Sequence, residues 1–514
     1  MNIGEHLNKK ENIICMEYKY IDNNYYLNNK TSLFNNFKLK KQIKNNNKKF
    51  VNNLFNIDYK VNSISLDNNQ KEAVFTNEVN TLVLAGAGSG KTLTIVGKIN
   101  YLVNELNINP KEILCISFTN DTVNNLKEKI SSEIDVFTFH KLALEIIYDY
   151  KKNLIIVSNY LEYIINEIFL SIVGNIDEKI LKSFNKTISS FINLFKNYNY
   201  DYSYFNKLLK KNNSKILELI RIIYLIYDDE LKSTNYIDFN DMINISIKLI
   251  SERGLKRYYK YIIIDEFQDI SENRYRLIKA IKDSCNSKIF AVGDDFQSIY
   301  KFAGSNLNMI TNFKKYFGYT KIIKIVNTYR NSNELVTVAS NFIMKNKKQI
   351  KKDLVSNKHS YKPIKIIYYS KNEIIKFKKI LDMVNGNILI LGRNNYDLNS
   401  VLDDEIKYDN KIIYCGKEYE FKTVHKSKGL EEENVIILNM SDNTYGFPNK
   451  KKDDITKILL PKDKYLYEEE RRLFYVALTR TKNNVYIFVD KEKPSIFIKE
   501  LIRKSKKNIE VLDL

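Results

Sequence analysis

The sequence predicts an α/β chain with two lobes, each a parallel sheet flanked by helices, with a helical insertion in the first lobe and no large insertion in the second. Strand-like apolar runs alternate with helical patterns over most of the chain, which is typical of parallel α/β structure. Residues 151–235 interrupt this alternation with helical patterns alone, such as ILELIRIIYLIYDDEL. A second alternating series begins near Lys321. We therefore expect the first lobe at 63–150 and 236–320, the insertion at 151–235 and the second lobe at 321–514.

Residues 1–62 precede the first lobe as a basic extension. They are rich in Asn, Lys and Tyr, and their apolar periodicity is weak. Such a composition is typical of a basic helix or of a partly disordered segment, and both remain open. The strands that follow are expected at TLVL, EILCISF, DVFTF, YIIIDEF and KIFAVGD in the first lobe, and at KIIKIV, PIKIIYY, NILILGR, EFKTV, NVIILNM and NVYIFVD in the second.

The charge balance suits a polyanionic partner. The 514 residues include 82 Lys+Arg against 61 Asp+Glu, a net charge of +21. An excess of this size is most often found in proteins that bind nucleic acid. Codon bias is the alternative, because the abundance of Asn, Lys, Ile and Tyr is what an AT-rich genome produces. Charge alone leaves both open.

Cysteine usage and hydropathy argue against several classes of protein. The four cysteines, Cys15, Cys115, Cys285 and Cys415, lie far apart and form no CxxC pair. They predict neither a zinc site nor a disulfide framework. No apolar run reaches transmembrane length, and no signal-peptide pattern opens the chain. We expect a cytoplasmic protein without a membrane partner, associated with the nucleoid if the source is bacterial.

The stretch TLVLAGAGSGKTLTI predicts a phosphate-binding loop. An apolar strand, a run of small residues, Lys91-Thr92 and a helical pattern follow one another in the order of a P-loop. Backbone N–H groups of such a loop turn toward an anion, and the helix N-terminus adds partial positive charge. Lys91 is expected to reach the β- and γ-phosphates and the Thr92 hydroxyl to bind Mg²⁺. The loop residues are Ala85, Gly86, Ala87, Gly88, Ser89 and Gly90, with Ala85 in place of the pattern's first glycine.

Two further stretches place polar residues directly after apolar strands. In YIIIDEFQD, Asp265 can hold Mg²⁺ and Glu266 can polarise an attacking water. In FAVGDDFQSIYKFAG, Gln297 can sense a γ-phosphate. Tyr300 and Phe302 follow it, and they are either core residues or, if exposed, platforms on which bases stack.

Two arginines lie at junctions of strands and helices in the predicted second lobe. Arg330 follows Tyr329 in NTYRNSNEL, and Arg480 ends the helical pattern of YVALTRTKNNVYIF. An arginine supplied from a second lobe can neutralise the charge of a phosphoryl-transfer transition state. A single arginine is more often part of a surface ion pair.

These motifs together resemble the superfamily 1 DNA helicases of the UvrD/Rep type. The resemblance runs from about Leu66 to Asp490. The motifs DEFQDISENR, FAVGDDFQSIYKFAG and EEERRLFYVALTR are similar in sequence to those of the DNA helicase IV branch. It implies two RecA-like lobes and the cofactors ATP and Mg²⁺. It also implies an ATP-dependent single-stranded DNA translocase and 3′–5′ helicase that acts on single strands and junctions in repair, replication or recombination.

The resemblance assigns roles to individual residues. It implies that Gln70 reads adenine, that Tyr329 stacks on it and that Glu431 contacts the ribose. Asp265 and Glu266 become the metal carboxylate and the catalytic base, and Arg330 and Arg480 the two arginine fingers. The implied single-strand contacts are Phe118, Thr119, Asn120, Phe139, His140, Tyr300, Phe302 and His425. Thr423, His425 and Lys428 lie on the implied path between ATP and DNA, and neither His140 nor His425 is expected to titrate.

Many relatives carry a large domain between the positions of Arg393 and Thr423, which are only 30 positions apart in this chain. A nucleotide-regulated protein that remodels RNA polymerase is a second hypothesis, but the 62-residue extension is short for the coiled-coil arm of such relatives. RNA as the substrate is a third, because stacking and backbone contacts tolerate either sugar.

Overall fold

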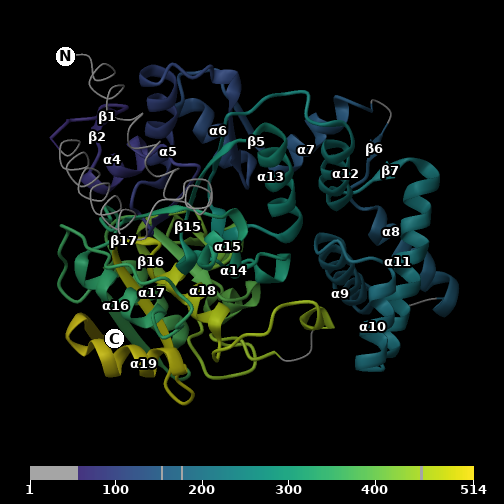
Figure 1. Cartoon of the computed structure of the whole chain (residues 1–514). Coiled ribbons are helices and arrows are strands. Elements are labelled where there is room, and N and C mark those ends of the chain that lie inside the picture. The colour runs from purple at the N-terminus through teal and green to yellow at the C-terminus, as the bar shows by residue number, and fades with distance from the viewer. Residues whose placement is uncertain (1–55, 152–153, 175–176, 452–454) are drawn as a thin grey trace, which may run out of the picture.

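The computed structural model describes residues 56–151, 154–174, 177–451 and 455–514. Two large sheets flanked by helices and a separate group of helices make up the described part of the molecule (Figure 1). Of the predicted N-terminal extension, only residues 56–62 fall within the described ranges. None of the helices in these ranges is both long and apolar enough to cross a bilayer.

The first sheet has six parallel strands in the order β10-β3-β9-β8-β4-β5. The strands are β3 (Asn80–Ala85), β4 (Ile113–Ser117), β5 (Asp135–Thr138), β8 (Tyr261–Ile264), β9 (Lys288–Gly293) and β10 (Lys321–Ile325). β3 and β8 are buried along their whole length, as expected of central strands covered on both faces. A small hairpin, β1 (Lys60–Val61) with β2 (Ile64–Ser65), precedes the sheet.

Helices cover both faces of the first sheet. One face packs against α4 (Asn68–Phe75), α5 (Lys91–Asn100) and α6 (Asn120–Lys129). The other packs against α7 (Phe139–Tyr148), α12 (Phe239–Arg253), α13 (Glu272–Cys285), α14 (Leu307–Thr311) and α15 (Phe313–Phe317). The carboxyl ends of the strands therefore meet at one edge, where the polar motifs that follow them come together.

The second sheet has eight strands in the order β13-β14-β15-β12-β16-β17-β11-β18. They are β11 (Ile364–Tyr369), β12 (Ile388–Gly392), β13 (Lys407–Asp409), β14 (Lys411–Tyr414), β15 (Lys417–Thr423), β16 (Glu432–Ile437), β17 (Thr481–Asp490) and β18 (Ile509–Leu512). The six neighbouring strands β15-β12-β16-β17-β11-β18 are all parallel, and β13 and β14 add an antiparallel edge. One face packs against α16 (Asn333–Ile343), α18 (Glu468–Leu478) and α19 (Ile496–Ser505), and the other against α17 (Glu373–Met383).

The strand KIIKIV corrects the expected division between the lobes. β10 pairs in register with β3, from Lys321 opposite Thr81 to Ile325 opposite Ala85. It therefore completes the first sheet, whereas the sequence pattern assigned it to the second lobe. The second sheet begins only with β11 at Ile364.

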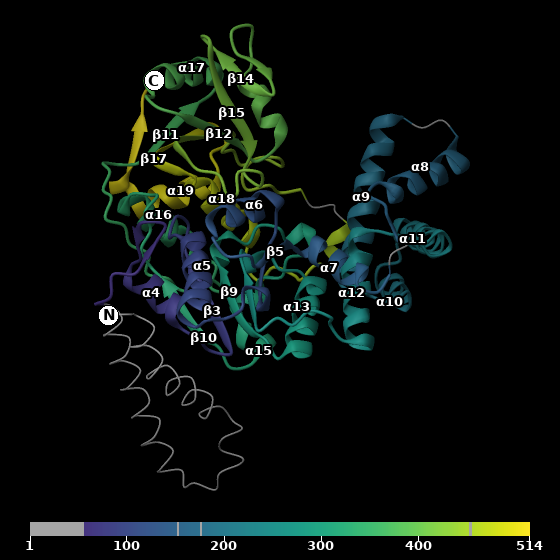
Figure 2. The same cartoon turned by 90° about the horizontal axis from the view of Figure 1, so that it is seen from above.

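The helical insertion stands apart from both sheets (Figure 2). It consists of α8 (Tyr160–Val173), α9 (Glu178–Asn197), α10 (Ser203–Asn212) and α11 (Lys215–Thr234), with the short pair β6 (Ile155–Ile156) and β7 (Tyr236–Ile237) where the chain leaves and rejoins the first lobe. These helices have their own apolar core.

A segment of the second lobe contributes to that core. We call residues 455–463 the strap. Leu459 is buried among side chains of the insertion, and Ile455, Ile458 and Leu460 pack against the same cluster. At the end of the strap, Asp463 Oδ1 lies 2.6 Å from Nζ of Lys301 in the first lobe. The strap thus touches the other two parts of the molecule.

Candidate active site

The P-loop follows β3 and leads directly into α5. Gly88 and Gly90 have φ values of 70° and 78°, in the left-handed region that favours glycine. A Cβ on Gly88 would lie 2.4 Å from Cβ of Arg330. Glycine is therefore required at position 88 both for its backbone angle and for the close approach of the Tyr329–Arg330 loop.

Gln70 and Tyr329 border the P-loop. Nε2 of Gln70 donates to the carbonyl of Ser89 at 3.0 Å, and its Oε1 accepts from the backbone of Asp67. Tyr329 is 51% exposed, and its hydroxyl donates to Oδ2 of Asp67 at 2.8 Å. The Tyr329 ring can receive a stacking partner, whereas both ends of the Gln70 amide are already engaged, Nε2 by the P-loop and Oε1 by the N-cap of α4.

Two carboxylates follow β8 and face the P-loop lysine. Nζ of Lys91 lies 3.2 Å from Oε1 of Glu266. Asp265 is buried, and its Oδ1 accepts from the backbone N–H of Glu266 at 2.8 Å. Glu266 has φ 47°, a left-handed conformation unusual for a non-glycine residue, which turns it away from the strand direction.

Burial and neighbouring charges shift the pKa values of Asp265 and Glu266 in opposite directions. Burial, followed by the neighbouring Glu266, raises the pKa of Asp265. Burial acts to raise the pKa of Glu266 as well, but Lys91 and Lys428 outweigh it and lower that pKa. The site therefore keeps Glu266 ionised, the form that can accept a proton.

Two residues with oxygen donors suited to a hard cation, Thr92 and Asp265, adjoin the paired side chains of Lys91 and Glu266 in the sequence. Asp265 directly follows β8, and Thr92 is the second residue of α5, next to Lys91. Within the described ranges, no group of three or more His, Cys, Asp and Glu side chains is placed to hold a metal. Mg²⁺ does not require such a cage, because it usually binds one or two protein oxygens together with substrate phosphates. The donor set fits a magnesium-nucleotide.

Gln297 is held by the first lobe and touched by the second. Its Nε2 donates to Oδ2 of Asp294 at 2.7 Å, and its Oε1 accepts from Nη2 of Arg480 at 3.0 Å. Gln268 joins this loop to the catalytic carboxylate, because its Oε1 accepts from the backbone of Asp294 and its Nε2 donates to Glu266. The amide of Gln297 thus lies on a contact between the lobes.

The two predicted arginines both point into this interface. Arg480 is 1% exposed, and its other donors reach the carbonyls of Val476 and Leu430. Burial and then the proximity of Arg330 lower the pKa of Arg480 to about 9. Nε of Arg330 donates to Oε2 of Glu431 at 2.6 Å. Glu431, for which a ribose contact is expected, is thus paired with Arg330.

Exposed aromatics lie beyond Gln297. Phe302 is 54% exposed, which contradicts the alternative that it is a core residue. Its ring packs edge-on against His425, with centroids 5.4 Å apart. Tyr300 lies behind it, with its hydroxyl donating to the carbonyl of His425 and Nζ of Lys428 5.0 Å from its ring centroid.

The first lobe adds a second aromatic group. Phe118 is partly buried and packs against Phe139, with Arg274 5.0 Å above its ring. Phe139 is only 2% exposed, so its ring supports Phe118 and cannot itself stack on a base, which corrects the expectation. Phe239, 46% exposed and 5.2 Å from the His140 ring, carries no motif and was not predicted. Its signal is an apolar residue directly after the N-cap Asp238, at the exposed start of α12.

Thr119 and Asn120 lie exposed where α6 begins. The hydroxyl of Thr119 accepts from the backbone of Thr122 as the helix N-cap. The N-terminus of α6, with its free N–H groups, therefore lies next to Phe118.

His140 and His425 are neutral near pH 7. Burial and then Arg274 lower the pKa of His140 to about 4. Burial, Arg393 and Lys428 lower the pKa of His425 to about 3.

Lys352 is a buried residue of this region that no motif marks. Its side chain is fully buried, and Nζ lies 2.7 Å from Oδ1 of Asp294. Lys352 stands in a Lys-rich run, NKKQIKKD, which by itself reads as solvated surface. Only the fold brings it against the Asp294 loop.

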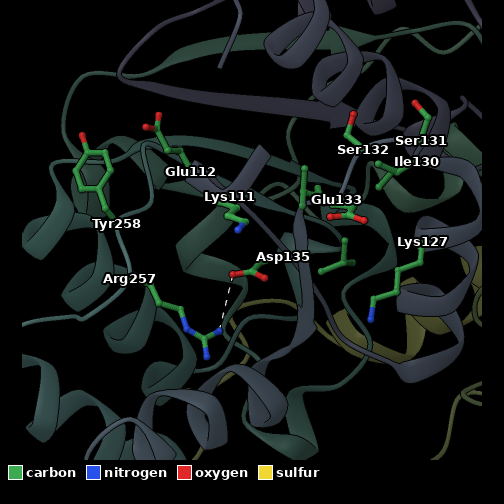
Figure 3. Close-up of a pocket in the computed structure, with 12 residues that line it drawn as sticks. Lys111, Glu112, Lys127, Ile130, Ser131, Ser132, Glu133, Asp135, Arg257 and Tyr258 are labelled. Atoms are coloured by element: carbon green, nitrogen blue, oxygen red, sulfur yellow. Dashed lines mark ion pairs between the residues drawn. The ribbon is translucent and has the colours of Figure 1, made fainter. Parts of the chain in front are cut away.

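A cavity of about 860 Å³ opens at the opposite edge of the first sheet (Figure 3). Its lining comes from residues before β4 and β8, from the end of α6, and from the start of β5 with the residues before it, among them Lys111, Glu133 and Asp135. Arg257 and Asp135 face each other across it, 3.8 Å apart. None of the predicted site residues lines this cavity. The candidate active site therefore lies elsewhere, at the carboxyl ends of the strands, where the two lobes meet.

Sequence comparisons agree with this geometry. The profile of the UvrD/REP helicase N-terminal domain matches residues 66–318, and that of the UvrD-like helicase C-terminal domain matches residues 400–492. The chain is 29% identical over 502 residues to DNA helicase IV of Escherichia coli (strain K12), covering 88% of this chain and 71% of that protein. It is 30% identical over 461 residues to the ATP-dependent DNA helicase Rep of Buchnera aphidicola subsp. Acyrthosiphon pisum (strain APS), covering 82% and 68%. Against the ATP-dependent DNA helicase PcrA of Leuconostoc citreum, identity is 27% over 391 residues, covering 70% and 51%.

Proposed function

Because the chain belongs to the UvrD/REP helicase family, we propose that it is an ATP-dependent DNA helicase that steps 3′ to 5′ along a single strand and unwinds duplexes. The observation that carries this is the contact between Gln297 of the first lobe and Arg480 of the second, close to the Glu266 carboxylate that faces the P-loop lysine. A site shared by two lobes can convert hydrolysis into relative motion of the lobes.

In the proposed hydrolysis, Lys91 and the N–H groups of the P-loop hold the phosphates. Thr92 and Asp265 would hold Mg²⁺, which would supply positive charge to neutralise the phosphate oxygens. Glu266 accepts the proton of the attacking water, a role supported by its ionised state and its position beside Lys91. Arg330 and Arg480 stabilise the charge that develops on the transferred group.

The adenosine end is proposed to lie over Tyr329. Its half-exposed ring offers a face for the base, and its hydroxyl is anchored on Asp67. Gln70 lies at the same border and would read adenine only by exchanging its present partners. Glu431 would do the same to reach a ribose, because it now pairs with Arg330.

A chain of contacts joins the nucleotide site to the proposed DNA path. Nζ of Lys428 donates to the carbonyl of Gln297 at 2.8 Å and pairs with Asp269. The same ammonium lies over Tyr300, whose hydroxyl reaches His425, and His425 packs on Phe302. A shift of Gln297 when phosphate is released can therefore reach the exposed aromatic ring.

The DNA path itself is proposed to run over Phe302, His425, Phe239 and Phe118. Exposed aromatic rings stack on bases without regard to sequence, at about 1–3 kcal/mol per base. The N-terminus of α6, with Thr119 and Asn120, would hold a backbone phosphate. Tyr300 and Phe139 support this surface from beneath, and His140 borders it as a neutral ring.

The experiment that tests the proposed function measures ATP hydrolysis alone, with single-stranded DNA, with RNA and with RNA polymerase. We expect single-stranded DNA to stimulate hydrolysis strongly and the other two to do so weakly. Equal stimulation by RNA would mean that DNA is not the specific substrate. Stimulation by polymerase alone would favour a protein that remodels RNA polymerase over a helicase. Absence of hydrolysis under every condition would contradict the proposal.

A further inference from the structure

Residues 349–358 run across three parts of the nucleotide site. Nε2 of Gln349 donates to the carbonyl of Asp295 at 2.6 Å. Leu354 packs over the P-loop, where a Cβ on Gly86 would lie 2.9 Å from its methyl groups. Val355 forms a bridge with Asn327, next to the Tyr329–Arg330 loop. We call this segment the brace. Because it contacts the Asp295 loop, the P-loop and the strand end before Tyr329, it can fix their relative positions.

The brace carries one fully buried cation, Lys352. Nζ contacts Oδ1 of Asp294 at 2.7 Å and a carboxylate oxygen of Asp295, and it lies 3.6 Å from the ring centroid of Phe296. The side chains of both ion pairs are 0% exposed. Removing an ammonium from water is costly, and apolar residues of similar size often replace such pairs without loss of stability. Stability alone is therefore a weak reason for a lysine at this position.

Asp294 divides its two oxygens between Lys352 and Gln297. Oδ1 accepts from Lys352 and from the backbone of Phe296, and Oδ2 accepts from Nε2 of Gln297 at 2.7 Å. Because Nε2 of Gln297 is bound to Asp294, the other end of the amide, Oε1, must face Arg480. The ammonium of Lys352 thus fixes the carboxylate that selects one of the two amide orientations of Gln297.

We propose that Lys352 is a positioning residue for ATP hydrolysis, which orients the amide of Gln297 through Asp294 so that Oε1 meets Arg480. This inference rests on the proposed function, because it gives Gln297 and Arg480 their roles in turnover. Without Lys352, Oδ1 of Asp294 loses its cation and keeps only the backbone N–H of Phe296 as a partner. The carboxylate is then held less firmly, and so is the orientation of the Gln297 amide. Arg480 would then meet the amide nitrogen in part of the population.

Asp295 separates this role from simple support of the fold. Asp295 holds the brace through Gln349, the backbone N–H of Ile350 and Lys352, but it makes no contact with Gln297 among the described hydrogen bonds. A structural role of Lys352 would depend on both carboxylates, whereas a positioning role depends on Asp294 alone. The two aspartates therefore provide matched variants.

The test measures kcat and KM for ATP at saturating single-stranded DNA. In Lys352→Met we expect kcat to fall by about 10- to 100-fold, because the interaction acts on transition-state geometry, while KM stays within about twofold. Asp295→Asn should keep nearly the wild-type kcat. Lys352→Met combined with Asp294→Asn should be no slower than Asp294→Asn alone, because both changes break the same chain of contacts.

Two further variants keep the test decisive if Lys352→Met is unstable. Lys352→Met with Asp295→Asn removes one charge of each sign and should still show the lowered kcat. Lys196→Met removes another buried lysine, which pairs with Asp238 and Asp241 in and beside the insertion, and measures the cost in melting temperature of losing such a pair. A Lys352→Met protein with wild-type kcat, or one whose kcat falls only in proportion to lost folded protein, would overturn the inference. An inactive wild-type protein would instead contradict the proposed function.

Discussion

Glu266 is proposed to be the base, and its geometry supports a sharp test. The carboxylate is ionised beside Lys91, and an amide at this position cannot accept a proton. Glu266→Gln should therefore bind ATP with near wild-type affinity and lose turnover by at least about 10²-fold. Lys91→Ala should instead lose turnover together with nucleotide affinity. Fluorescent-nucleotide titration and steady-state hydrolysis measure the two effects, and a Glu266→Gln protein with normal turnover would exclude Glu266 as the base.

Phe302 is exposed, so its truncation should alter DNA binding without unfolding the lobe. We expect Phe302→Ala to weaken single-strand binding by about 1–3 kcal/mol. The dependence on salt, about 0.7 log units per log[salt] for each phosphate neutralised, should stay unchanged because stacking releases no ions. Tyr361→Ala, at a 76% exposed tyrosine of the second lobe, is the matched control. A lowered melting temperature with unchanged DNA affinity would assign Phe302 to packing.

His140 gives the free energy of unfolding a predictable dependence on pH. Its pKa is lowered to about 4 in the folded protein, below the ordinary value of about 6.5. Between these values the unfolded chain binds the proton and the folded protein does not, so the stabilisation is complete above about pH 6.5 and is lost as pH falls. His140→Gln should remove a slope of about 1.4 kcal/mol per pH unit in this window. Urea unfolding at pH 5, 6 and 7 tests this, and identical slopes for both proteins would contradict it.

Residues that follow a strand within one motif could be predicted from the sequence. Asp265 directly follows an apolar run, and Lys91 and Gln297 follow one after a short loop; parallel strands bring such positions to one edge. Lys352 could not be predicted, because its carboxylate partners lie 57 and 58 positions away and its neighbours are surface lysines. Phe139 was assigned to the DNA surface because its motif says nothing about which way the ring points.

At the level of secondary structure, the alternation of strands and helices predicted most elements and misplaced one. β10 lies last in the first lobe's sequence but pairs with β3 at the edge of the first sheet. Its pattern, KIIKIV, has no feature that distinguishes an edge strand of the first sheet from the first strand of the second. Strand order is decided by long-range pairing, which local periodicity does not encode.

The strap is an element that no periodicity revealed, and it makes a testable contact. Leu459 is buried in the core of the insertion although it belongs to the second lobe's part of the chain. Leu459→Ala should cost about 2–5 kcal/mol of local stability and should speed hydrogen exchange in α9 and α11, but not in β3 or β9. Leu466→Ala, at a 71% exposed leucine nearby, is the control. Equal exchange in wild type and Leu459→Ala would show that the strap only rests on the insertion.

In the whole molecule, a hydrogen bond, an ion pair and an apolar contact are among the interactions that join the two lobes and the insertion. Arg480 reaches Gln297, Lys428 reaches Asp269, and the strap reaches the insertion. These contacts connect the nucleotide site to the exposed aromatic surface and to the helices beside it. Motion of one lobe against the other must therefore act on all three parts together.

Unwinding of tailed duplexes tests this coupling most directly. A duplex with a 3′ single-stranded tail should be separated by the wild-type protein in the presence of ATP and Mg²⁺, and a duplex with a 5′ tail much more slowly. Arg480→Ala should still bind the 3′-tailed duplex. Its rate of strand separation should fall by the same factor as its rate of ATP hydrolysis. Strand separation that is equally fast without ATP, or that survives in Arg480→Ala after hydrolysis is lost, would contradict the coupling of turnover to unwinding.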